Sequence, residues 1–175
     1  MAGFLSSSIW LKIAFIGLCL ASVLFVIGFA TVAWMSYDHP QLDYGLWKTR
    51  YCSGRQCQET EVDNRLLRTL QLDGQAKDWY RASQVMECFG LVCMLIALIL
   101  LFVFVFAESC RRRNILIAII ALIFAAVVFM IIGISVFATK FENRGGSVGW
   151  SMGLAIASAI FAFVSDIMLV LELKK

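Results

Sequence analysis

The sequence predicts an α-helical membrane protein with four transmembrane helices and one long loop between the first two. Three observations support this fold class. The 175 residues are 61% hydrophobic and 15% charged, whereas soluble domains are about half apolar and a quarter charged. Four apolar segments are each long enough to cross a bilayer, which takes about 20 helical residues. Basic residues gather at one end of these segments, which fixes the direction of insertion.

The four apolar segments run near residues 9–33, 84–107, 115–138 and 148–171. Backbone polar groups need internal partners inside a bilayer, so each segment should be a helix and the helices should pack as a bundle. The first segment is longer than a secretory signal, so we expect it to be retained. We therefore treat residues 1–175 as a single four-span membrane domain. Several glycines offer small surfaces for close helix approach, with ordinary glycine abundance as the alternative: Gly17, Gly28, Gly133, Gly149 and Gly153.

Positive charge predicts that both termini lie in the cytoplasm of a multi-pass plasma-membrane protein. Three arginines, at positions 111–113, fill the turn between the second and third segments, and Lys174 and Lys175 close the chain. Short loops rich in arginine and lysine stay on the cytoplasmic side. The first loop, about residues 36–83, balances its basic and acidic residues, as an exported loop can. The second extracellular loop is short, about residues 139–147.

The first loop shows a strand pattern. Residues 44–52 alternate in side-chain character, are rich in aromatic residues and run into a Ser53–Gly54 turn. This pattern predicts a β-hairpin. Residues 59–72 fit either a short helix or an edge strand.

The cysteines suggest one covalent link and one modification site. Only Cys52 and Cys57 lie in the extracellular loop, where oxidising conditions allow a disulfide, so we expect them to be paired. A metal or redox pair is the alternative, but it needs further ligands, and the one histidine, His39, is distant in sequence. Cys110 lies at the cytoplasmic membrane edge beside the arginines, where reversible palmitoylation is common. An unmodified thiol is the alternative there.

Charges inside the segments are few. Lys12 and Asp166 are the charged residues that lie furthest into the apolar segments, at similar depth near the cytoplasmic side. We hypothesise that they form an intramembrane pair between the first and last helices. Glu87 lies at the outer end of the second segment, where we expect it to be hydrated.

No residue constellation for catalysis is recognisable. The sequence has no serine, histidine and acid cluster, no phosphate-binding glycine loop and no facing carboxylates, so neither an enzyme nor a cofactor or metal is expected. The net charge of +3 is small and dispersed, which argues against nucleic-acid binding. Mid-membrane polar residues typical of a transporter are also missing, since the third segment has no charge.

The first loop resembles the signature of the claudin superfamily. That superfamily holds claudins, peripheral myelin protein, epithelial membrane proteins, the lens intrinsic membrane protein and the gamma subunits of channels and receptors. The matching residues are Trp34 at the end of the first segment, Gly45, Leu46 and Trp47, the cysteines 52 and 57, and Arg81 at the entry to the second segment. Residues 133–135 with 143–144, and 149–151, are similar to the epithelial membrane protein branch.

The resemblance implies a left-handed four-helix bundle with a small extracellular antiparallel sheet, formed mainly by the first loop and joined by the disulfide. It also implies that Trp34, Leu46 and Trp47 anchor this sheet at the outer membrane edge, which amphipathic aromatics favour. The alternative is that they only maintain the fold. The chain ends directly after the fourth segment, so a PDZ scaffold is not an expected partner. The short second loop and closely spaced cysteines fit the epithelial and lens branch better than a tight-junction role.

The leading functional hypothesis is a non-enzymatic protein of cell contacts or junctions and of membrane organisation. Its first loop would meet copies of itself or other membrane proteins in the same or the opposing membrane, because aromatic and arginine side chains tend to carry interface energy. The alternative is an auxiliary, gamma-type subunit of an ion channel or receptor. A paracellular barrier or pore is the third hypothesis. The lipid bilayer is a partner in each case.

Overall fold

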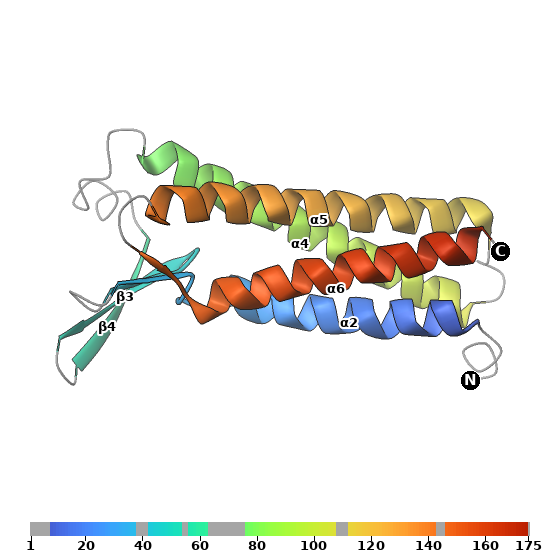
Figure 1. Cartoon of the computed structure of the whole chain (residues 1–175), viewed down its shortest axis with the longest axis horizontal. Coiled ribbons are helices and arrows are strands. Elements are labelled where there is room, and N and C mark those ends of the chain that lie inside the picture. The colour runs from blue at the N-terminus through green and yellow to red at the C-terminus, as the bar shows by residue number, and fades with distance from the viewer. Residues whose placement is uncertain are drawn as a thin grey trace.

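The computed structural model describes residues 8–37, 42–53, 56–62, 76–107, 112–142 and 146–174. Within them lie four long helices: α2 (Ile9–Ala30), α4 (Ala76–Phe106), α5 (Arg113–Glu142) and α6 (Trp150–Leu173). The strands are β1 (Met35–Tyr37), β2 (Leu42–Tyr44), β3 (Lys48–Ser53), β4 (Gln56–Glu61) and β5 (Ser147–Val148). The helices form a long bundle with the sheet projecting from one end, which we call the sheet end (Figure 1). The start of α2 and the end of α6 lie at the opposite end.

All four helices are long and apolar enough to span a membrane. Large apolar side chains cover their outward faces; Ile16 of α2 and Ile99 of α4 are each 62% exposed. Such surfaces are stable against lipid and not against water. The apolar exterior of the bundle therefore supports the four-span membrane protein that the sequence predicts.

Two helices extend beyond the segments expected from hydropathy. α4 begins at Ala76 rather than near Gln84, and α5 continues to Glu142 rather than ending near Ala138. The extra turns are less apolar, so hydropathy alone does not include them. The helix α5 contacts β5, and Tyr80 in the extra turns of α4 donates a hydrogen bond to the turn between β2 and β3.

The most extensive helix packing is between α2 and α6 and between α4 and α5. A Cβ on Gly28 of α2 would lie 2.8 Å from the carbonyl oxygen of Ser151 on α6. Further along the same pair, Ser158 Oγ donates a hydrogen bond to the carbonyl of Ala21 at 2.8 Å. Small residues thus allow close backbone approach, as expected for Gly28. Gly153, by contrast, has no atom within 4 Å of a built Cβ.

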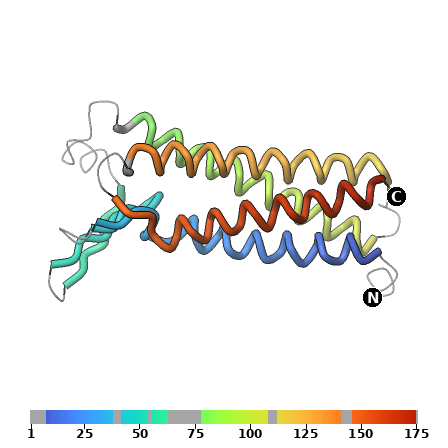
Figure 2. The backbone as a smooth tube through the Cα atoms, viewed as in Figure 1, coloured from blue at the N-terminus to red at the C-terminus, as the bar shows by residue number. Residues whose placement is uncertain are grey.

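The strands form one antiparallel sheet in the order β4-β3-β2-β1-β5. The first loop supplies β1 to β4, which confirms that this loop builds most of the sheet. The second loop adds β5, which pairs Val148 with Met35 and Ser147 with Ser36 of β1. The backbone trace in Figure 2 shows that the β3–β4 hairpin lies furthest from the helices. The predicted hairpin is therefore present, and the start of the 59–72 stretch is an edge strand.

The expected hydration of Glu87 is wrong. Its side chain is fully buried, and neither carboxylate oxygen has a hydrogen-bond partner among the described residues. The reason is the early start of α4. With Ala76 as its first residue, Glu87 lies about three turns into the helix rather than in its first turn. It faces α5, where it packs beside Gly133.

Lys12 and Asp166 lie on the closely packed helices α2 and α6, toward the end of the bundle that is remote from the sheet. Asp166 is buried, and its Oδ1 has no hydrogen-bond partner within the part of the chain that the structure describes. Near the same helix ends, Ser8 Oγ donates a hydrogen bond to the carboxylate of Glu172. The pairing of Lys12 with Asp166 stays a prediction.

Candidate functional site on the sheet and its anchor

Trp34 joins the sheet to three of the helices. Its indole Nε1 donates to the carbonyl of Gly28 at the end of α2, at 2.7 Å. Its backbone N–H donates to Tyr44 of β2, and its carbonyl accepts from the N–H of Gly149 before α6, both at 2.9 Å. The ring packs edge-on against Phe137 of α5, with centroids 5.5 Å apart. Trp34 is fully buried, so its role is to fix the sheet on the bundle.

The turn between β2 and β3 is held by α4. The hydroxyl of Tyr80 donates to the carbonyl of Gly45, and Gln84 Nε2 donates to the carbonyl of Leu46 at 2.8 Å. A Cβ on Gly45 would lie 2.6 Å from Cα of Val32, so only glycine lets the turn approach this backbone. Leu46 and Tyr80 are buried. The turn is therefore a docking point for α4.

Trp47 is the one tryptophan of the family motif that lies at the surface. Its side chain is 38% exposed, and its ring lies 5.3 Å from that of Phe29 on α2. Arg81 of α4 is exposed beside it. Of the three side chains expected at the membrane edge, only Trp47 is exposed there. Trp34 and Leu46 are interior residues: Trp34 packs against Phe137 of α5 beside the start of α6, and Leu46 docks on α4 through Gln84.

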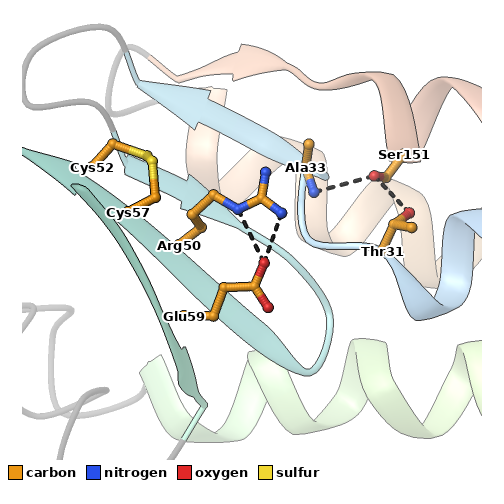
Figure 3. Close-up of polar contacts among 7 residues, drawn as sticks. All are labelled: Thr31, Ala33, Arg50, Cys52, Cys57, Glu59 and Ser151. Carbon is orange, nitrogen blue, oxygen red and sulfur yellow. Dashed lines mark hydrogen bonds and ion pairs between the residues drawn. A yellow bond between two sulfur atoms is a disulfide. The ribbon is translucent and has the colours of Figure 1, made fainter. Parts of the chain in front are cut away.

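Ser151 links the first and last helices just below the sheet (Figure 3). Its Oγ accepts hydrogen bonds from Thr31 Oγ1 at 2.8 Å and from the backbone N–H of Ala33 at 3.1 Å. Its own N–H donates to the carbonyl of Ala33 at 2.9 Å. The chain that leaves α2 is thus tied to the start of α6 before it enters β1. This link holds the first strand against the bundle.

The β3–β4 hairpin is closed by the expected disulfide. Cys52 and Cys57 are directly opposite in the strand register, with their Cα atoms 4.1 Å apart, and their sulfurs are bonded (Figure 3). Within the residues that the structure describes, no group of three or more His, Cys, Asp or Glu side chains could hold a metal ion. The covalent link fixes the tip of the hairpin that projects furthest from the helices.

One ion pair crosses the same hairpin. Arg50 Nη2 and Nε donate to Glu59 Oε1 at 2.7 and 3.1 Å, and the two residues are opposite in register (Figure 3). The hydrogen bond from Arg50 lowers the pKa of the Glu59 carboxyl below its ordinary value, and the charge of Arg50 acts in the same direction. Both side chains are partly exposed, so the pair favours hairpin register more than overall stability.

The hairpin presents a polar surface. All six residues of β4 are exposed, and β4 is an edge strand of the described sheet. On β3, Tyr51 is exposed and lies opposite Gln58. An exposed aromatic ring among hydrogen-bonding side chains is typical of a surface for protein contacts.

The sequence alone does not identify Tyr80, Gln84 and Ser151 as site residues. Tyr80 is adjacent to Arg81 of the family motif. A tyrosine in a sequence does not, however, indicate which group its hydroxyl will contact. Ser151 falls within residues 149–151, which are similar to the epithelial membrane protein branch, but this similarity does not indicate a role for it. Cys110, the predicted palmitoylation site, lies outside the described residues.

The fold and this anchored sheet define a class: a four-span membrane protein whose two loops combine in one sheet at a single end of the bundle. The model of the PMP-22/EMP/MP20/Claudin family matches residues 7–169. The chain belongs to this family. No individual curated protein matches it.

Proposed function

We propose that the protein is a non-enzymatic contact protein of the plasma membrane, with its sheet outside the cell and its termini in the cytoplasm. The sheet meets a second copy or another membrane protein in the same or the opposing membrane. The observation that carries this proposal is the asymmetry of the sheet. Its β1, β2 and β5 side is fixed to the helices, whereas the disulfide-closed β3–β4 hairpin is the part of the described sheet that lies furthest from them.

The arrangement suits partner recognition because the surface is preorganised. A disulfide and a cross-strand ion pair order the hairpin before any partner arrives. Binding then loses less conformational entropy than it would with a flexible loop. The exposed Tyr51 and its neighbour Gln58 offer an aromatic contact and an amide on one side of the hairpin.

The experiment that tests this role is expression in cells that do not otherwise adhere. Fluorescently tagged protein should concentrate where two expressing cells touch. Enrichment confined to these contacts identifies a second copy as the partner, and equal enrichment against non-expressing cells identifies another membrane protein. The double variant Tyr51→Ala, Gln58→Ala should reach the surface but lose this enrichment. Ile99→Ala, at a membrane-facing position of α4 outside both grooves, is the control and should keep it. Uniform distribution of the wild-type protein would overturn recognition across opposing membranes.

The orientation can be tested separately. After mild reduction of intact cells, a membrane-impermeant maleimide should label Cys52 and Cys57. An epitope added at the C-terminus should be stained only after permeabilisation. Staining of that epitope on intact cells would place the sheet in the cytoplasm and exclude a contact role.

A second candidate function is that of an auxiliary subunit of a channel or receptor. The observation that favours it is an apolar groove of about 380 Å³ between α5 and α6, whose lining includes Phe124, Val128, Ile156 and Ile160. A transmembrane helix of a partner fits such a surface, because helices in membranes associate by close van der Waals packing. Purification in mild detergent would distinguish the roles. Recovery in fixed proportion with one larger membrane protein, lost in Ile160→Trp, supports the auxiliary role.

A further inference from the structure

A second groove lies on the membrane-facing side of α4, directly below the sheet. Its volume is about 440 Å³, within the range of small-molecule sites. The lining residues come from the β2–β3 turn and from α4: Trp47, Arg81, Gln84, Val85, Cys88, Phe89 and Val92. The groove is separate from the contact surface on the β3–β4 hairpin and from the groove between α5 and α6.

The polarity of this groove changes along its length. Arg81 and Gln84 lie at the sheet end, while Val85, Phe89 and Val92 follow toward the middle of the membrane. The last three are each about half exposed, at 48–53%, so they form an apolar track along one face of α4. From Arg81 to Val92 the track is about 16 Å long at the helical rise. A ligand that matches it has a polar head and a long apolar tail.

The polar end of the groove is suited to a phosphate group. An arginine guanidinium presents parallel N–H donors that match phosphate oxygens, and it binds them more strongly than neutral donors do. The amide of Gln84 is held in place, because its Nε2 donates to the carbonyl of Leu46 at 2.8 Å. Trp47 adds an amphipathic ring of the kind that favours the membrane interface.

We propose that this groove binds one phospholipid from the leaflet on the sheet side. Its phosphate lies at Arg81, one acyl chain follows Val85, Phe89 and Val92, and the ring of Trp47 covers the glycerol region. The proposal does not depend on the contact role of the hairpin.

A phospholipid fits better than a partner helix because the turn between β2 and β3 borders the sheet end of the groove. Trp47, at the base of the sheet, lines its upper end. A transmembrane helix would have to continue past that point out of the membrane, whereas a lipid ends at its headgroup. The groove between α5 and α6 differs, since none of its lining residues is charged.

The test uses the full-length protein in nanodiscs of phosphatidylcholine with a trace of phosphatidylcholine carrying a diazirine on its acyl chain. After illumination, crosslinked peptides are identified by mass spectrometry. Labelling should concentrate on residues 81–92. Val85→Trp, which fills the groove, should remove it, while Val128→Trp in the α5–α6 groove is the matched control and should not. Equal labelling of all membrane-facing helix surfaces would overturn the proposal.

Competition distinguishes phosphate recognition from simple occupation by lipid. Unlabelled phosphatidylcholine should displace the probe, and a galactosyl diacylglycerol with the same chains should compete about tenfold less well, as expected from loss of a charge-assisted hydrogen bond. Arg81→Gln should abolish this preference and Arg81→Lys should retain part of it. If Arg81→Gln does not fold, the two tryptophan variants still decide the site. Equal competition by the glycolipid, or displacement by cholesterol alone, would contradict a phospholipid site.

Discussion

The side chain of Glu87 on α4 occupies the space that a side chain at Gly133 on α5 would need. A Cβ built on Gly133 would lie 2.9 Å from Glu87 Cδ and 3.0 Å from its Cγ, and would overlap the carboxylate as well. Glu87 is fully enclosed, so it has little room to move away. The glycine is therefore what allows a carboxyl group to be accommodated between two closely packed transmembrane helices.

Gly133→Ala should lower the free energy of unfolding by about 1–3 kcal/mol, the usual cost of overpacking an interior. The measurement is thermal unfolding in detergent. Gly153→Ala is the matched control: no atom lies within 4 Å of its built Cβ, so it should be neutral or slightly stabilising. Adding Glu87→Ala to Gly133→Ala should recover part of the loss. Equal effects of the two glycine variants would contradict the packing argument.

Ser151→Ala should destabilise the junction between α2, α6 and the sheet by about 1–3 kcal/mol, because the variant leaves the N–H of Ala33 without its side-chain acceptor. Thr31 loses the same acceptor, but its hydroxyl can donate instead to the carbonyl of Ile27, 2.7 Å away. Ser147→Ala, which removes only a solvent-exposed hydrogen bond from Ser147 Oγ to the carbonyl of Ser36, is the control and should change little. The thermal midpoints of the two variants in one detergent provide the comparison. Unchanged stability in Ser151→Ala would show that the link to Ala33 is dispensable.

Tyr80→Phe should loosen the docking of the β2–β3 turn on α4. The variant keeps the ring packing on Phe137 but removes the donor to the carbonyl of Gly45, at a cost of about 1–3 kcal/mol for a buried unpaired acceptor. Tyr51→Phe, at an exposed tyrosine, should have almost no effect. Hydrogen exchange of the amides in residues 45–48 should rise in Tyr80→Phe only. Equal exchange in both variants would argue against this anchor.

Cys52→Ser should reduce delivery to the cell surface while leaving the four helices intact, because each helix satisfies its own backbone hydrogen bonds. Loss of the small disulfide ring removes about 2 kcal/mol from the stability of the hairpin. Cys93→Ala, at a free cysteine within α4, is the control. Surface biotinylation measures delivery, and circular dichroism of purified protein measures helix content. Normal delivery of Cys52→Ser would contradict a requirement for the closed hairpin.

The Arg50–Glu59 pair should make the hairpin sensitive to acid. Because Arg50 lowers the pKa of folded Glu59, the pair stabilises the hairpin above the ordinary carboxyl pKa of the unfolded chain. That stabilisation is lost as the pH falls through the lowered pKa of the folded state. An NMR titration of the Glu59 carboxyl should show the pKa moving up toward its ordinary value in Arg50→Ala. An unchanged titration in that variant would show that Arg50 is not the cause.

The membrane-spanning bundle can be predicted from the sequence because lipid imposes a single requirement, a long apolar helix, which hydropathy detects directly. The sequence was also sufficient for the hairpin and its disulfide, which depend on local alternation and on two cysteines in one loop. It did not predict β5. A strand of two residues has too little pattern to detect, and it exists because β1 offers it an edge from more than a hundred positions away.

The burial of individual side chains was less predictable. Trp34 and Trp47 are both aromatic residues near the end of a span, yet one is enclosed and the other exposed. The difference arises from tertiary packing of α5 and α6 around Trp34, which no local pattern records. Glu87 shows the same limit, because its depth depends on where α4 starts. The start lies in a polar stretch that hydropathy cannot resolve.

The position of β5 also has a consequence for synthesis. β1 to β4 come from the first loop, but the outer edge of β1 is covered only when residues 147–148 arrive, just before the final helix. Until then the nascent chain carries an open strand edge, a template for pairing with other chains. A product truncated before α6 would keep that edge permanently, and we expect it to aggregate or be degraded. Completion of the sheet thus marks a chain whose translation has reached its last span.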